Sequence, residues 1–134
     1  MCLTKVHSGP HGDTNGIYRG YKIVFADTFG WRAPYYREKQ YTYQCWYEAE
    51  SRILESDHRE KYDSGFHLFK TMEEARCFRN YINDGFVNSL DIIPVSYREI
   101  LAVGEQLREK VIVAKHICAN IDFELNKTIK LTTW

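Results

Sequence analysis

The chain of 134 residues carries 18 basic residues (Lys and Arg) and 18 acidic residues (Asp and Glu), and 44% of its residues are hydrophobic. This size and composition are typical of one globular domain. The balanced charge argues against a DNA-binding protein, which needs a basic field. No apolar run is long enough to span a membrane, and the polar N-terminal stretch lacks the apolar core of a signal peptide. We therefore expect a cytoplasmic protein that does not contact membranes.

Residues 1–16 are predicted to form a flexible N-terminal arm, because polar residues and glycines dominate this stretch. Residues 17–134 are predicted to form a single domain. Its first strand is expected at 17–26, where aromatic and β-branched residues gather. Alternating tyrosines favour a second strand within 35–50. The charged stretch 49–62 is predicted to be mostly loop.

A strand at 65–70 and a helix after it have the clearest local signals. Thr71 and Glu74 have the T-x-x-E spacing of a capping box, in which two side chains satisfy backbone amides at a helix start. Apolar residues at helical spacing predict a buried stripe made of Met72, Ala75, Phe78, Tyr81 and Ile82. The run Asn83-Asp84-Gly85 is expected to end the helix.

The C-terminal third is predicted to be an antiparallel hairpin. Its strands are expected at 90–103 and 111–121, with a polar turn at 104–110. Pro94 favours an edge position or a break in the first of these strands. A last short strand is expected at 128–132. The predicted fold class is therefore α+β: a mostly antiparallel sheet of four to six strands with one main helix packed on one face.

Aromatic and basic residues are mixed in the N-terminal half. Aromatic rings can stack on a nucleotide base while guanidinium groups neutralise a phosphate, and a histidine beside a glycine can orient such a ligand. The alternative is an ordinary sheet with buried rings and solvated cations. The predicted ligand-binding residues are Tyr18, Arg19, Arg32, Tyr35, Tyr36, Arg37 and His67.

Other candidate chemistry is less supported. His116 and Cys118 share one face of a predicted strand and could be two zinc ligands, although such pairs are usually packing residues. Removal of Met1 would leave Cys2 as an N-terminal nucleophile, but no other part of a hydrolase site accompanies it. We predict no catalytic residue, no metal and no cofactor.

Several motifs carry a resemblance: the Met1-Cys2-Leu3 start, the Gly65-Phe66-His67 strand followed by Thr71 and Ala75, and the Ile100-Leu101-Ala102 strand before the last hairpin turn. In these the chain resembles a group of small uncharacterised bacterial and bacteriophage proteins. The resemblance implies a bacterial or phage cytosol and no particular activity. A fainter likeness is to ADP-ribosyltransferase-type folds, at Tyr18-Arg19-Gly20 and Gly65-Phe66-His67. Because no catalytic glutamate motif follows, that likeness implies a ligand-binding relative.

We therefore expect a small non-enzymatic binding or accessory protein of bacterial or phage origin. It would recognise a protein partner, such as a component of a host system, or a nucleotide-like small molecule through an aromatic-basic face. The first alternative is an enzyme acting on a nucleotide or NAD, with Arg19 and His67 holding phosphate. The second is an RNA-binding module. A homo-oligomer is compatible with the sequence.

Overall fold

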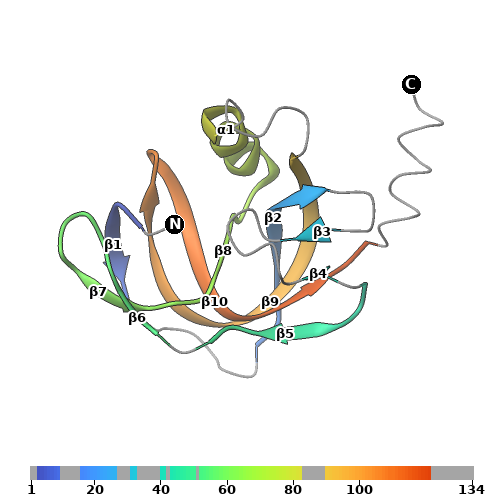
Figure 1. Ribbon diagram of the computed structural model, residues 1–134, viewed down its shortest axis with the longest axis horizontal. Helices are drawn as coiled ribbons and strands as arrows, with labels where there is room; N and C mark the ends of the chain where they lie inside the picture. Colours follow the sequence, from blue (N-terminus) through green and yellow to red (C-terminus); the bar gives the residue numbers. More distant parts are fainter. Residues whose placement is uncertain are drawn as a thin grey trace.

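The computed structural model describes residues 3–9, 16–26, 31–32, 40–41, 43–50, 52–82 and 90–121. In these residues the fold is α+β, as predicted: one helix packs against a mostly antiparallel sheet (Figure 1). The elements are β1 (Lys5–Ser8), β2 (Tyr18–Ala26), β3 (Trp31–Arg32), β4 (Gln40–Tyr41), β5 (Trp46–Glu48), β6 (Ile53–Glu55), β7 (Lys61–Asp63), β8 (Phe66–Leu68), α1 (Met72–Ile82), β9 (Leu90–Gln106) and β10 (Glu109–Ala119).

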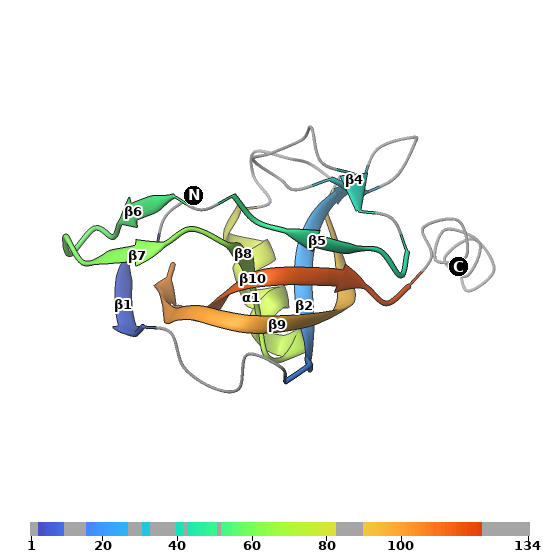
Figure 2. The same ribbon diagram turned by 90° about the horizontal axis from the view of Figure 1, so that it is seen from below.

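The long β9–β10 hairpin organises the sheet. The first half of β9 pairs with β2 and its second half pairs with β1, so one strand serves two partners on one edge. In the same way, β10 pairs first with β8 and then with β5. The small strands β3 and β4 extend the sheet beyond β2, and β6 pairs only with β7 in a separate two-stranded sheet. Figure 2 shows β5, β10 and β9 running side by side.

The sheet curls until β2 meets the chain directly after β8. Tyr21 of β2 and Phe69, directly after β8, exchange two backbone hydrogen bonds of 2.8 Å. The path β2–β9–β10–β8 is therefore closed into a ring of strands. Gly20 permits this approach, because a Cβ atom there would lie 2.7 Å from the carbonyl oxygen of Phe69.

Apolar side chains fill both sides of the curled sheet. The inner side holds two adjoining clusters of buried residues: Val24, Phe66, Ile93, Val95, Ile117 and Ala119 in one, and Leu68, Tyr97, Val103, Ile112 and Ala114 in the other. A third cluster lies under α1 and the N-terminal segment and includes Leu3, Ile23, Tyr62, Phe69, Ala75, Phe78, Val111 and Val113. Both faces of β10 are thus buried, which explains its nearly continuous apolar sequence.

The helix begins close to where the capping signal predicts. The Glu74 amide donates to the Thr71 hydroxyl at 3.2 Å, and that hydroxyl donates to the Glu74 carboxylate at 2.8 Å. Ala75 and Phe78 are buried, and the Phe78 ring lies 5.1 Å from that of Phe69 between centroids. Tyr81 is 57% exposed, so the prediction that it belongs to the buried stripe is wrong. At about 100° per residue, position 81 falls at the margin of the face that carries Ala75 and Phe78.

The prediction of a flexible arm is wrong for residues 3–9. Leu3 is fully buried, its amide donates to the Tyr62 hydroxyl at 2.8 Å, and β1 pairs with β9. Gly104 leaves room for this segment, because a Cβ atom there would collide with the Lys5 carbonyl and the Leu3 side chain. The polar composition of the segment concealed a short edge strand that one buried leucine anchors.

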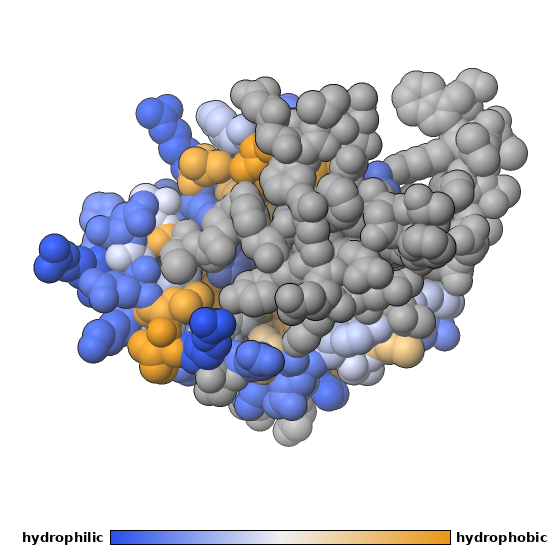
Figure 3. Space-filling view, viewed as in Figure 1, coloured by the Kyte–Doolittle hydropathy of each residue, from blue (hydrophilic) through white to orange (hydrophobic). Residues whose placement is uncertain are grey.

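Three other boundaries differ from the prediction or fall outside the structure. The stretch predicted as mostly loop contains β6 and the start of β7, and Ile53 of β6 is 65% exposed. Figure 3 shows apolar surface in this region of the molecule. The hairpin turn comprises only Leu107 and Arg108, since β9 ends later and β10 begins earlier than predicted. The strand predicted at 128–132 lies outside the described residues.

Among the residues that the structure describes, no helix is long and apolar enough to cross a membrane.

Candidate functional site

The predicted ligand-binding residues do not share one surface where the structure describes them. Tyr18 points to the inner side of β2 and stacks on Tyr97 with 5.6 Å between ring centroids. Arg19 is its neighbour and is exposed. Successive side chains of a strand point to opposite faces, so these two residues cannot hold one ligand together. His67 is partly buried in β8.

The side chains of four predicted residues lie outside the described part of the structure. Arg32 lies in β3, where only the backbone is described. Tyr35, Tyr36 and Arg37 lie outside the described residues. Arg19 is therefore the one predicted residue whose side chain is both described and exposed.

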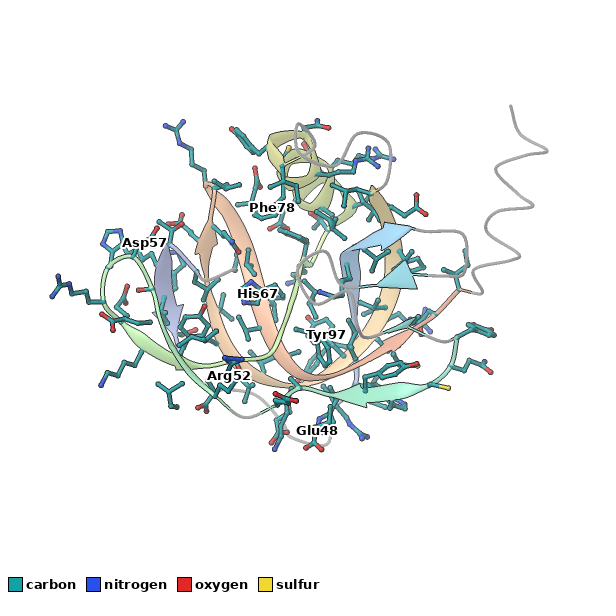
Figure 4. The ribbon with its side chains drawn as sticks, viewed as in Figure 1. Glu48, Arg52, Asp57, His67, Phe78 and Tyr97 are labelled. Atoms are coloured by element: carbon teal, nitrogen blue, oxygen red, sulfur yellow. The ribbon has the colours of Figure 1, made fainter. Side chains whose placement is uncertain are left out.

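His67 belongs to a polar cluster in which it joins Lys22 and Gln106, from three different strands. The Lys22 ammonium donates to the His67 carbonyl at 2.9 Å, and the His67 Nδ1 atom lies 3.2 Å from the Gln106 Oε1 atom. Lys22 and Gln106 are only 6% and 5% exposed. Figure 4 shows His67 in the middle of the fold.

Burial controls the charges in this cluster. It lowers the pKa of Lys22 to about 8. Burial first, and then the nearby Lys22 charge, lower the pKa of His67 to about 4, while the Gln106 hydrogen bond acts in the opposite direction. At neutral pH, His67 is therefore a neutral imidazole, and its Nδ1 atom carries the proton because Gln106 Oε1 can only accept. The cluster satisfies buried polar groups and joins strands, which is a structural role.

A second grouping lies on the outer face of the β2–β9–β10–β5 sheet. We define the outer face as the side chains that point away from the inner clusters on these four strands. Cross-strand pairing aligns Arg19 with Ser96, Ser96 with Cys118, and Cys118 with Trp46. A parallel row aligns Arg98 with His116 and His116 with Glu48. Figure 4 shows Glu48 projecting from the sheet on the side away from Tyr97.

The centre of the outer face is a cation–π pair. The Arg98 guanidinium lies 4.6 Å from the centroid of the Trp46 ring, although the two residues belong to β9 and β5 with β10 between them. The side chain of Arg98 therefore crosses the intervening strand. Trp46 remains 38% exposed and nearby Tyr43 is 40% exposed. Such a pair at an exposed position contributes about 0.5–1 kcal/mol, so it orders these side chains while leaving them accessible.

Two carboxylates and two basic groups form the rim of the outer face. Lys115 Nζ lies 3.6 Å from Glu48 and 3.9 Å from Glu99. His116 Nε2 lies 3.6 Å from the Glu48 carboxylate, and His116 Nδ1 lies 3.6 Å from that of Glu99. Glu99 has a positive φ of 61°, close to the irregular register between β9 and β10. The His116 Nδ1 atom is buried and has no hydrogen-bond partner within range. The carboxylates of the face are thus already opposed by basic groups.

In the described part of the chain, the carboxylates of the outer face lie beside basic groups, but its arginines do not lie beside acidic ones. Within the described residues, neither Arg19 nor Arg98 has a carboxylate partner. The guanidinium of Arg19 is exposed, and that of Arg98 is held against a ring. The face therefore offers two cations that a partner can pair.

His116 and Cys118 do share one face of β10, as predicted. Cys118 is buried, however, and burial followed by the proximity of Cys45 raises the pKa of its thiol. Among the residues that the structure describes, no group of three or more His, Cys, Asp or Glu residues is arranged to hold a metal ion.

The sequence did not indicate that Arg98 is a site residue, nor that it contacts Trp46. Strand alternation alone could have assigned Arg98, His116 and Cys118 to their faces, but their alignment with β5 depends on strand register. Comparison of the chain with protein-family models, with curated protein sequences and with solved structures found no match.

Proposed function

We propose that this chain is a small non-enzymatic binding protein whose outer face docks onto an acidic patch of a protein partner. The observation that carries the proposal is the pair of arginines, Arg19 and Arg98, that lack carboxylate partners beside an accessible Trp46 ring. Trp, Tyr and Arg are the residues most enriched at the energetic centres of protein interfaces. Arginine also forms bidentate pairs with carboxylates, which makes an acidic surface the complementary one.

The form of the site favours a protein over a small ligand. Two parallel rows of side chains, one across four strands and one across three, make a broad surface, since adjacent strands are about 4.8 Å apart. A folded partner can contact such a surface at many points. The zero net charge of the chain disfavours a polynucleotide, whose binding depends on many phosphate contacts. The proposal includes a role as an accessory factor in a bacterial or phage-infected cytoplasm.

The alternative of a nucleotide- or NAD-acting enzyme requires Arg19 and His67 at one accessible site. In the structure the His67 ring contacts Gln106 and its carbonyl accepts from Lys22, while Arg19 is exposed on the opposite side of β2 from Tyr18. The observed positions therefore favour the binding protein.

The test uses immobilised protein and bacterial lysate, followed by quantitative mass spectrometry. A partner retained by the native chain is purified, and its affinity is measured for Trp46→Ala and Arg98→Ala. We expect each substitution to weaken binding at least about tenfold, which corresponds to about 1.4 kcal/mol. Added salt should weaken binding further, because the paired charges are partly exposed.

Matched controls come from α1. Arg76→Ala and Tyr81→Ala remove an exposed cation and an exposed ring at positions away from the outer face. They should leave the affinity unchanged. The proposal is wrong if the partner binds all four variants equally, if the retained species is RNA, or if it is a second copy of this chain.

A further inference from the structure

A separate groove lies at the other end of the β9–β10 hairpin from β5. It has a volume of about 510 Å³ and is lined by His7, Ser8, Val103, Glu105, Arg108 and Lys110. β1 forms one wall, and the strands next to the hairpin turn form the other. Figure 1 shows β1 beside this end of the hairpin, whereas β5 lies beside the opposite end. The groove and the outer face therefore share no residue.

The groove has an excess of basic groups. Arg108 and Lys110 are exposed, and His7 lies 3.5 Å from the single carboxylate of the lining, that of Glu105. Glu105 also faces Lys110 directly across the strand pair. The one negative group is thus opposed from two sides, while the Arg108 guanidinium has no carboxylate partner in the described part of the chain. Val103 is the apolar residue of this lining, with 8% of its surface exposed.

The backbone that presents Arg108 is in an unfavourable conformation. The two turn residues, Leu107 and Arg108, both have positive φ, at 49° and 69°. A two-residue hairpin turn of this kind normally uses Asn and Gly, which adopt positive φ readily. Both residues here are exposed, so packing of their side chains does not explain the choice. Non-glycine residues with positive φ cluster at binding sites, but exposed Arg59 also has one, so this conformation supports a site only together with the groove beside it.

We propose that this groove binds a small phosphate monoester of nucleotide size, with Arg108 and Lys110 holding the phosphate and Val103 contacting the remainder. The guanidinium fork of Arg108 suits phosphate oxygens, and the Lys110 ammonium adds a second charge-assisted contact. The Ser8 hydroxyl can donate a hydrogen bond to the same group. The volume falls within the roughly 300–1,000 Å³ of small-molecule sites.

Isothermal titration and NMR titration with AMP, phenyl phosphate and inorganic phosphate test this site. We expect saturable one-to-one binding of at least one of the two esters, with a Kd between about 10 µM and 1 mM, and weaker binding of inorganic phosphate. Arg108→Gly and Lys110→Gln should each weaken the ester at least about tenfold.

The β6–β7 hairpin offers matched controls. Arg59 is exposed and also has a positive φ, of 62°, so Arg59→Gly makes the same chemical and conformational change at another turn. Lys61→Gln is the equivalent control for Lys110. Both controls should keep native affinity. The proposal is overturned if neither ester binds saturably, or if inorganic phosphate binds more tightly than the esters. It is also overturned if the two groove variants do not bind the ester more weakly than the two controls. Because the outer face is elsewhere, this result is independent of the protein-binding test.

Discussion

The ammonium of Lys22 donates a 2.9 Å hydrogen bond to the backbone carbonyl of His67, and so joins β2 to β8 beside the backbone contact between Tyr21 and Phe69. The ring of strands closes at this point. A buried carbonyl without a donor costs about 1–3 kcal/mol, and a lysine amine supplies the donor from a neighbouring strand. The same burial makes the Lys22 charge unfavourable in the folded state.

Replacement of Lys22 by Met tests the balance between these two effects. The pKa of Lys22 is about 8 in the folded protein and 10.5 when the side chain is unperturbed, so the unfolded chain binds more protons between these pH values. The stability of the native protein should therefore rise, relative to Lys22→Met, by about 3 kcal/mol as the pH rises from 8 to 10.5. Urea denaturation of both proteins at several pH values measures this difference. A constant difference would show that Lys22 is not a buried titrating group.

His67 predicts a second pH dependence, on the acidic side. Its pKa is lowered from 6.5 to about 4, so the unfolded chain binds more protons in this window and acid destabilises the folded state. Between pH 6.5 and pH 4, the native protein should lose about 3 kcal/mol more stability than His67→Gln. Chemical denaturation across this pH range compares the two proteins. Identical profiles for the native protein and His67→Gln would contradict the assignment.

The two titrations are also linked. Because the Lys22 charge contributes to the lowered pKa of His67, Lys22→Met should move the His67 pKa upward. NMR titration of the imidazole protons reports this directly. An unchanged His67 pKa in the variant would show that burial alone sets it.

The elements that could be predicted from the sequence have local signals. The capping pair Thr71 and Glu74 lies within one turn, and β10 is a nearly continuous run of apolar residues. Strand partners have no local signal: β1 pairs with β9 through Lys5 and Glu105, which are separated by about a hundred residues. For this reason the fold class was predictable, whereas the role of residues 3–9 as an edge strand was not.

The candidate site shows the same limit. Strand alternation places Tyr18 and Arg19 on opposite faces, and this could have been applied from the sequence. The contact between Arg98 and Trp46 depends on the registers of two strand pairs, which in turn depend on packing throughout the sheet. The sequence therefore predicted that aromatic and basic residues form the site, but only the structure shows which of these side chains are in contact.

The contact between α1 and the sheet should be essential to stability. Phe78 is buried and packs on Phe69, so Phe78→Ala leaves a cavity in the cluster beneath the helix. We expect this change to reduce the free energy of unfolding by about 3–5 kcal/mol. Tyr81→Ala removes an exposed ring from the same helix and should change it by less than about 1 kcal/mol. Thermal and urea denaturation compare the two. Equal effects would contradict the packing of α1 described above.

The hairpin turn leads to the last prediction, that stability and ligand binding conflict at Leu107 and Arg108. Each non-glycine residue with a positive φ costs about 1–2 kcal/mol. Leu107→Asn with Arg108→Gly gives the sequence that this turn prefers, so the double variant should be about 1–2 kcal/mol more stable than the native protein. Urea denaturation measures the gain, and Leu107→Asn alone should give a smaller one. Since the double variant also lacks the Arg108 guanidinium, it should be more stable and yet bind phosphate esters less tightly. A double variant that is no more stable than the native protein would show that the turn is not strained, and it would remove the backbone conformation as an argument for the groove.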